Sequence, residues 1–160
     1  MSTTTGIGYD CHRLTPGRRL VLGGVQIPHE LGLEGHSDAD VLTHAIIDAL
    51  LGACALGDIG QHFPDTDPHY AGAESIELLR SVAALLEQAG YSVVHVDATV
   101  VIERPKLAPV RDLMRAELAA ALAIEVGHVS VKATRGEGIG FVGREEGVAA
   151  LAVATVRERA

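Results

Sequence analysis

Hydrophobic and polar residues alternate near the start of the chain, over residues 6–14, and this pattern predicts a β-strand. Because successive side chains of a strand point to opposite faces, Asp10 and His12 are expected on one face and Cys11 on the other. A ligand held by Asp10 and His12 is therefore expected to lie out of reach of Cys11.

Runs of β-branched residues indicate further strands. Residues 91–103 are rich in valine, and residues 129–134 form a shorter run of the same kind. The last apolar run, 148–156, has alanines that suit a helix and valines that suit a strand. Because this run is short and follows a glycine, we interpret it as a strand. Residues 19–28 have the pattern of a hairpin that turns at two central glycines.

Three segments carry apolar residues at helical spacing, approximately residues 38–55, 73–89 and 108–124. The first follows a polar loop rich in residues that cap helix N-termini. The second is followed by a glycine, which is a common helix stop. Strands and helices are mixed along 160 residues without an internal repeat, a linker or a low-complexity tract. The sequence therefore predicts a single α/β domain, residues 1–160.

The composition is that of a globular protein, with 48% hydrophobic and 21% charged residues. There are 13 basic and 21 acidic residues, a net charge of −8, and no basic stretch. This balance argues against a nucleic-acid partner. No apolar run is long enough to span a membrane, so no membrane contact is expected. Two cysteines make no disulfide framework and no secretory leader pattern is present, so the cytoplasm is the expected compartment.

Asp10, His12 and His44 carry the most informative chemistry, because together they offer one carboxylate and two imidazoles. These ligands suit zinc, manganese and related ions, and three protein ligands leave a position open for water or substrate. Asp48 lies four residues after His44 on the same helix face, where its carboxylate is a candidate partner for the His44 ring. By spacing alone, the alternative is a chance Asp-x-His pattern in a chain with eight histidines.

Three other segments allow two interpretations each. His36 and Ser37 precede the first predicted helix, where backbone N–H groups attract phosphate, although such residues can also simply cap the helix. The glycine-rich loop over residues 134–147 can present amides to phosphates or form an ordinary hairpin. Pro105 and Lys106 can hold a rigid loop that contacts a planar base, or can merely connect a strand to a helix.

Seven motifs follow one another along the chain. They are Gly-x-Asp-x-His at 8–12, Gly-His-Ser-Asp-x-Asp-x-x-x-His at 35–44, Asp-Ala-Leu-Leu-Gly-Ala at 48–53, Leu-Gly-Asp-Ile-Gly-x-x-Phe-Pro-Asp-Thr-Asp-Pro at 56–68, Arg-Pro-Lys at 104–106, Val-Lys-Ala-Thr at 131–134 and Gly-x-Gly-Phe-x-Gly-Arg-x-Glu-Gly at 138–147. Together they closely resemble the family of 2-C-methyl-D-erythritol 2,4-cyclodiphosphate synthases of the non-mevalonate isoprenoid pathway. The resemblance covers essentially the whole chain, and residues 36–68 are its most specific part.

The resemblance implies a mixed four-stranded sheet covered by helices on one face. It implies a homotrimer, with the sheets of three subunits packed around a threefold axis and active sites between neighbouring subunits. It also implies a metal-dependent phosphorus–oxygen lyase that converts 4-diphosphocytidyl-2-C-methyl-D-erythritol 2-phosphate into 2-C-methyl-D-erythritol 2,4-cyclodiphosphate and releases CMP. The 2-phosphate of the substrate is the attacking group, so no activated serine or cysteine is required. The alternatives are a metal-dependent phosphohydrolase and a trimeric cytidine-nucleotide binder without turnover.

The family motifs also imply ligands for two divalent cations. Asp10, His12 and His44 are expected to hold zinc or manganese, and Glu137 is expected to help hold magnesium or manganese across the diphosphate. His36 is expected beside the reacting phosphates. Metals can supply Lewis acidity and hold both phosphates in line, which explains how an acidic protein can act on this substrate.

Residues expected to contact the cytidine diphosphate substrate come from both halves of the chain. They are Asp10, His12, His36, Ser37, Asp58, Ile59, Gly60, Phe63, Pro64, Asp65, Thr66, Asp67, Ile102, Pro105, Lys106, Leu107, Ala108, Ala133, Thr134, Arg135, Gly136, Glu137, Phe141 and Arg144. Arg135 replaces a threonine that in the family is taken to stabilise the transition state. In that catalytic position its guanidinium either contacts a phosphate or turns to solvent.

Overall fold

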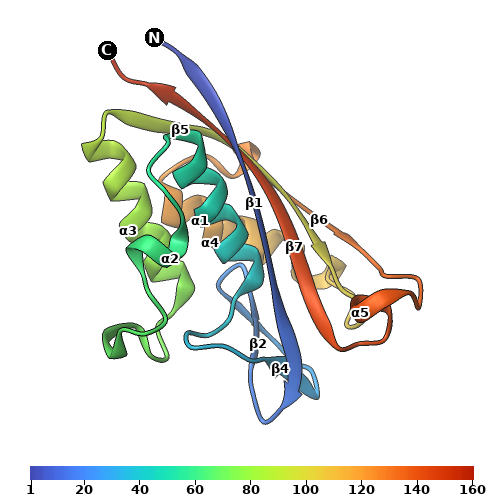
Figure 1. Cartoon of the computed structure of the whole chain (residues 1–160). Helices are drawn as coiled ribbons and strands as arrows, with labels where there is room; N and C mark the ends of the chain where they lie inside the picture. Colours follow the sequence, from blue (N-terminus) through green and yellow to red (C-terminus); the bar gives the residue numbers. More distant parts are fainter.

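A twisted β-sheet forms one side of the molecule, and helices pack against one of its faces (Figure 1). The computed structural model describes residues 1–160. Five strands form the main sheet in the order β4-β1-β7-β5-β6, and β2 and β3 form a separate hairpin. The strands are β1 (Thr3–Pro16), β2 (Leu20–Leu22), β3 (Val25–Ile27), β4 (Leu31–Leu33), β5 (Tyr91–Val101), β6 (Val129–Thr134) and β7 (Gly147–Glu158).

The sheet is mixed, as expected, but it has five strands, so the prediction of four is wrong. Strands β5 and β6 run parallel, whereas β7 is antiparallel to both β1 and β5. The additional strand, β4, pairs with the end of β1. It escapes prediction because it has three residues with a glycine at the centre, too few to show an alternating pattern. The final apolar run is strand β7, which confirms its interpretation.

The three longest helices cover the inner face of the sheet (Figure 1). The helices of the chain are α1 (Val41–Ala53), α2 (Ile59–His62), α3 (Ser75–Gln88), α4 (Arg111–Leu122) and α5 (Gly140–Gly143), with the 3-10 turns η1 (Pro68–Tyr70), η2 (Ala108–Val110) and η3 (Val126–His128). Helix α1 packs across β1 and β7, α3 packs beside α1 and against β5, and α4 packs against α3 and β6. The three predicted helices are α1, α3 and α4. No helix has the length and hydrophobicity needed to cross a bilayer.

Helix α1 approaches β1 closely because β1 has a glycine at both contact positions. A β-carbon placed on Gly8 would lie 1.9 Å from the carbonyl oxygen of Ala45, and one on Gly6 would lie 2.0 Å from that of Ala49. No side chain fits in these gaps, so this helix–strand spacing requires glycine. The close contact places His44, the neighbour of Ala45, directly over the next residues of β1.

The start of α1 is joined to the β2–β3 hairpin through one buried carboxylate. Asp40 accepts the backbone N–H of Thr43 at Oδ1 and the Thr43 hydroxyl at Oδ2. The same two oxygens accept the N–H groups of Gly23 and Gly24 in the hairpin turn. Burial raises the pKa of Asp40, and hydrogen bonds from Thr43 and Gly24 oppose that rise. Four donors thus hold the hairpin against the helix that carries His44.

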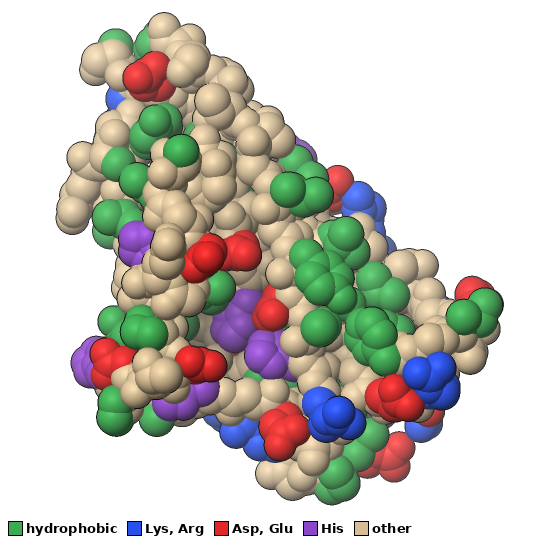
Figure 2. Space-filling model, in the orientation of Figure 1, with side chains coloured by type: hydrophobic (Ala, Val, Ile, Leu, Met, Phe, Trp, Pro, Cys, Tyr) green, Lys and Arg blue, Asp and Glu red, His purple; other side chains and the backbone are tan.

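The opposite face of the sheet is apolar and exposed. Ile7 and Tyr9 of β1 pair in register with Val153 and Leu151 of β7, and these four side chains are 42–73% exposed. Figure 2 shows a hydrophobic patch on this side of the molecule. The group of four is called the outer patch below. Contiguous apolar surface of this kind commonly marks a contact with another protein or a membrane.

Candidate active site

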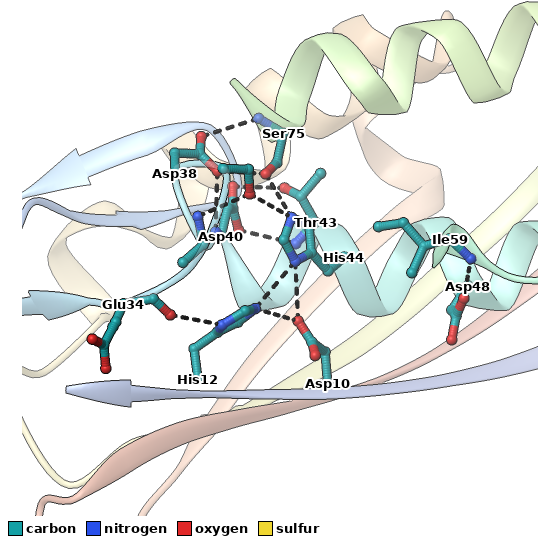
Figure 3. Close-up of polar contacts among 12 residues, drawn as sticks. Asp10, His12, Glu34, Asp38, Asp40, Thr43, His44, Asp48, Ile59 and Ser75 are labelled. Carbon is teal, nitrogen blue, oxygen red and sulfur yellow. Dashed lines mark hydrogen bonds and ion pairs between the residues drawn. The ribbon is translucent and has the colours of Figure 1, made fainter. Parts of the chain in front are cut away.

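Asp10, His12 and His44 converge, as their pattern in the sequence predicts (Figure 3). Asp10 Oδ2 lies 2.9 Å from His12 Nε2 and 3.1 Å from His44 Nδ1, and the two nitrogens are 3.3 Å apart. The three side chains are 12–28% exposed, so they are open to solvent on one side. Cys11 is exposed on the other face of β1, as predicted.

This donor set fits a divalent metal ion. A tetrahedral zinc ion about 2.0–2.1 Å from each ligand holds neighbouring ligand atoms about 3.3 Å apart. The three separations of 2.9, 3.1 and 3.3 Å are close to that value. Two imidazole nitrogens and one carboxylate suit zinc or manganese and leave a coordination position for a fourth ligand.

The three groups also shift one another's protonation. Burial alone raises the pKa of Asp10, but hydrogen bonds from His12 and His44 outweigh burial and lower this pKa from 3.8 to about 2. Burial lowers the pKa of His12, yet the hydrogen bond and charge of Asp10 more than compensate, so the pKa of His12 is raised above 6.5. Asp10 therefore stays ionised at neutral pH, the state required of a metal ligand.

Each imidazole ring is held from its far side. His12 Nδ1 donates to the carbonyl oxygen of Glu34 at 2.9 Å, which leaves Nε2 free to face the other two ligands. His44 Nε2 lies 2.7 Å from Ser75 Oγ and 3.3 Å from Ser37 Oγ. Such contacts orient the rings of metal-bound histidines in proteins.

The prediction that Asp48 holds the ring of His44 is wrong. Asp48 Oδ1 instead accepts the backbone N–H of Ile59 at 2.8 Å and so ties the start of α2 to α1 (Figure 3). Helical periodicity places Asp48 on the same side of α1 as His44, but Ser75 of α3 reaches the ring. The periodicity of α1 cannot indicate a hydrogen-bond partner that comes from a different helix.

A cavity of about 400 Å³ opens beside Asp10, His12 and His44. Residues of its wall that the sequence predicts as substrate contacts are Asp10, His12, His36, Ser37, Ile59, Gly60, Phe63, Pro64 and Asp65. Figure 2 shows this hollow, with histidine and acidic side chains gathered in it. Asp58, Thr66 and Asp67 are not part of the wall. Asp58 caps α2, and the Asp67 carbonyl accepts a hydrogen bond from His36 Nε2 at 3.0 Å.

A second cavity, of about 190 Å³, lies where β5 and β6 end. Predicted substrate contacts in its wall are Ile102, Pro105, Lys106, Leu107, Ala108, Ala133, Thr134 and Arg135. No residue lines both cavities, and Gly136, Glu137, Phe141 and Arg144 line neither of them. Within one chain, the residues expected to bind one substrate thus form two separate groups.

Arg135 and Glu137, predicted at the reacting groups, lie apart from the Asp10 cluster in this chain. The Arg135 guanidinium donates to Glu103 at 2.9 Å, and Glu103 also accepts the N–H of Gly136 at 2.8 Å. The Arg135 side chain is 64% exposed at the wall of the second cavity. Arg135 is therefore paired with a carboxylate and remains accessible from solvent.

Four further wall residues have no motif of their own in the sequence. Tyr70 and Leu78 line the first cavity, and Glu103 and Arg111 line the second. Tyr70 packs edge-on against Phe63, with ring centroids 5.4 Å apart. An aromatic residue in an otherwise polar loop is the one signal that could have indicated Tyr70, because such a ring normally needs an apolar partner.

The fold and this site define a mixed α/β protein in which two imidazoles and a carboxylate converge beside a cavity and could hold a divalent metal. The chain belongs to the YgbB family, whose model matches residues 3–157. The family resemblance carried by the seven sequence motifs is thereby confirmed.

Named relatives are similar to this chain over nearly its full length. A 2-C-methyl-D-erythritol 2,4-cyclodiphosphate synthase of Symbiobacterium thermophilum is 61% identical over 96% of this chain and 98% of its own. The synthase of the same name from Salinibacter ruber is 62% identical over 95% of this chain and 97% of its own. The structure of IspF from Plasmodium falciparum in a CDP complex matches with a TM-score of 0.87 and 28% identity, over 99% of this chain and 98% of that one.

Proposed function

We propose that this protein is a metal-dependent lyase of non-mevalonate isoprenoid biosynthesis. It converts 4-diphosphocytidyl-2-C-methyl-D-erythritol 2-phosphate into 2-C-methyl-D-erythritol 2,4-cyclodiphosphate and CMP. The observation that carries the proposal is the convergence of Asp10, His12 and His44 beside a cavity, in a chain about 60% identical to synthases of that name. In the reaction, an oxygen of the 2-phosphate forms a bond to the β-phosphorus. The bond from that phosphorus to the oxygen bridging the α-phosphate breaks, and CMP leaves with this oxygen.

Asp10, His12 and His44 would hold a zinc or manganese ion, which supplies Lewis acidity at a phosphate oxygen. The protein's own task is then positioning. His36 lies in the wall of the same cavity, and its hydrogen bond to the Asp67 carbonyl holds its ring there. Fixing both phosphates in a reactive geometry accounts for much of the rate gain in phosphoryl transfer, because the nucleophile belongs to the substrate.

The second cavity would take the cytosine end of the substrate. Its wall combines the loop at Pro105 and Lys106 with the end of β6 at Ala133 and Thr134, and backbone groups there would contact the planar base. The relative from Plasmodium falciparum was solved as a CDP complex, which supports a cytidine diphosphate ligand for this fold. Glu137 would help hold a magnesium or manganese ion across the diphosphate.

We further propose a homotrimer with active sites between subunits. The metal cavity and the proposed nucleotide cavity share no wall residue in one chain, so a neighbouring subunit would bring the two together. Ile7, Tyr9, Leu151 and Val153 of the outer patch would supply apolar surface for the packing of three sheets. We also expect the protein to act in the cytoplasm.

The decisive experiment supplies the substrate with zinc and magnesium and follows the phosphorus NMR spectrum. We expect CMP and a cyclic diphosphate in equal amounts, with no inorganic phosphate. His44→Ala should abolish CMP release, whereas His128→Ala, at an exposed histidine of η3, should not alter it. Release of inorganic phosphate would indicate a phosphohydrolase instead. Near-normal turnover by His44→Ala would remove His44 from the proposed metal ligands.

Subunit sharing has its own test. Light scattering should give a mass three times that of the 16.7 kDa chain. Mixing inactive His44→Ala subunits with subunits inactivated in the second cavity by Lys106→Glu should restore part of the activity, because hybrid trimers contain some sites with both halves intact. A monomer, or hybrids without any activity, would contradict the shared site.

A further inference from the structure

The ring of His44 bridges two sets of groups (Figure 3). Its Nδ1 faces Asp10 Oδ2 at 3.1 Å and His12 Nε2 at 3.3 Å. Its Nε2 faces the hydroxyl of Ser75, the first residue of α3, at 2.7 Å. The ring can serve a metal at Nδ1 only if the proton of the neutral imidazole resides on Nε2.

The hydrogen bonds around Ser75 determine which ring nitrogen of His44 carries the proton. The Ser75 hydroxyl donates to Asp38 Oδ1, and Asp38 also accepts the backbone N–H of Ser75 at 3.0 Å and that of Asp40 at 3.1 Å. A carboxylate can only accept, so the hydroxyl proton of Ser75 is committed to Asp38. The oxygen of Ser75 is then left to accept the N–H of His44 Nε2.

The chain of contacts is enclosed by protein. Ser75 is completely buried and Asp38 is 8% exposed, so water does not compete for these hydrogen bonds. A second hydroxyl, Ser37 Oγ, lies at the longer distance of 3.3 Å from His44 Nε2 and also accepts the N–H of Ala39 at 3.1 Å. The shorter contact from Ser75 is therefore the one that sets the orientation of the ring.

We propose that Ser75 and Asp38 are positioning residues for the metal site, and that they hold His44 with Nδ1 as its metal-binding atom. This inference rests on the proposed function, because it requires a metal at Asp10, His12 and His44. Loss of such a partner behind a metal-bound histidine typically weakens metal binding about 10- to 100-fold. The arrangement is the counterpart of the Glu34 carbonyl behind His12, but it comes from a separate helix.

Ser75→Ala tests this inference, because it removes only the contact of the hydroxyl group. It removes the hydroxyl but keeps the backbone N–H that binds Asp38, so the start of α3 stays anchored. We expect zinc affinity, measured by competition with a chromophoric chelator, to fall about 10- to 100-fold. The control is Ser81→Ala on the same helix, where the hydroxyl bonds only to the Glu77 carbonyl at an exposed position. Its zinc affinity should equal that of the unaltered protein.

The binding atom itself can be observed. In zinc-loaded protein labelled with nitrogen-15 at histidine, we expect the His44 resonances to show a protonated Nε2 and a metal-bound Nδ1. Coordination through Nε2, or equal zinc affinities for Ser75→Ala and Ser81→Ala, would overturn the inference while leaving the metal site intact. If the unaltered protein binds no zinc at this site, the metal role in the proposed function fails instead.

Discussion

Asp40→Asn should strongly destabilise the protein, because the carboxylate of Asp40 satisfies four donors in the core. In the variant, Oδ1 still accepts the N–H groups of Gly23 and Thr43, which lie 2.9 and 3.0 Å away. The amide nitrogen replaces Oδ2 and meets the N–H of Gly24 and the hydroxyl of Thr43, at 2.8 and 2.7 Å. The hydroxyl can turn and accept, but the Gly24 N–H cannot.

The expected magnitude follows from these contacts. One buried N–H without a partner costs about 1–3 kcal/mol, and two bonds that lose a charged acceptor become weaker by about 1 kcal/mol each. The neutral side chain is easier to bury than the carboxylate, which offsets part of this loss. We expect a net decrease of about 2–4 kcal/mol in the free energy of unfolding, or roughly 5–15 °C in Tm for a chain of this length.

Urea unfolding at a fixed protein concentration measures this change. Asp112→Asn provides the matched control, because the Asp112 side chain is 91% exposed and pairs only with Arg115 on the surface. Its effect should stay within about 0.5 kcal/mol. An Asp40→Asn variant as stable as this control would refute the reasoning, since the four hydrogen bonds would then carry no net stability at the junction of the hairpin and α1.

Three other changes have defined outcomes. Gly8→Ala places a β-carbon 1.9 Å from a backbone oxygen and should cost about 3 kcal/mol or more, whereas Gly127→Ala, with open space around it, should be nearly neutral in the same unfolding assay. Because the pKa of His12 is raised, protons should compete with zinc from a higher pH than for a free histidine. The apparent zinc affinity should fall up to about tenfold per pH unit below that pKa, and an affinity that does not change with pH would contradict this. Arg135→Thr removes an exposed pairing with Glu103 and should change kcat/KM by less than about fivefold; a larger loss would show that the guanidinium contacts the reacting phosphates.

Two of the three proposed metal ligands could be brought together from the sequence because their geometry is local. Asp10 and His12 are two residues apart on one strand, and the period of two alone places them together. His44 could be proposed from its chemistry and was supported by the family motif, but nothing in the periodicity of its helix says which strand it meets. The spacing that unites them depends on Gly6 and Gly8, whose role as contact positions for α1 emerges only when the two elements are packed.

The groups that hold the proposed ligands in place could not be predicted in the same way. Ser75 lies thirty-one residues after His44, and the contact depends on how α3 crosses α1. Asp48 has the right chemistry and helical spacing, but its carboxylate is used by the backbone of Ile59. Both cases concern competition among several buried donors and acceptors, and this competition is decided by tertiary packing rather than by any local pattern.

Strand β1 has an implication for how this protein can change over evolutionary time. Gly8 and Asp10 face α1, while Ile7 and Tyr9 face outward, so the two surfaces are interleaved residue by residue. A single-residue insertion or deletion between positions 6 and 12 would exchange the faces of the residues on one side of it. It would turn large side chains toward α1 or turn a proposed metal ligand away from the site. This short segment should therefore tolerate no change in length.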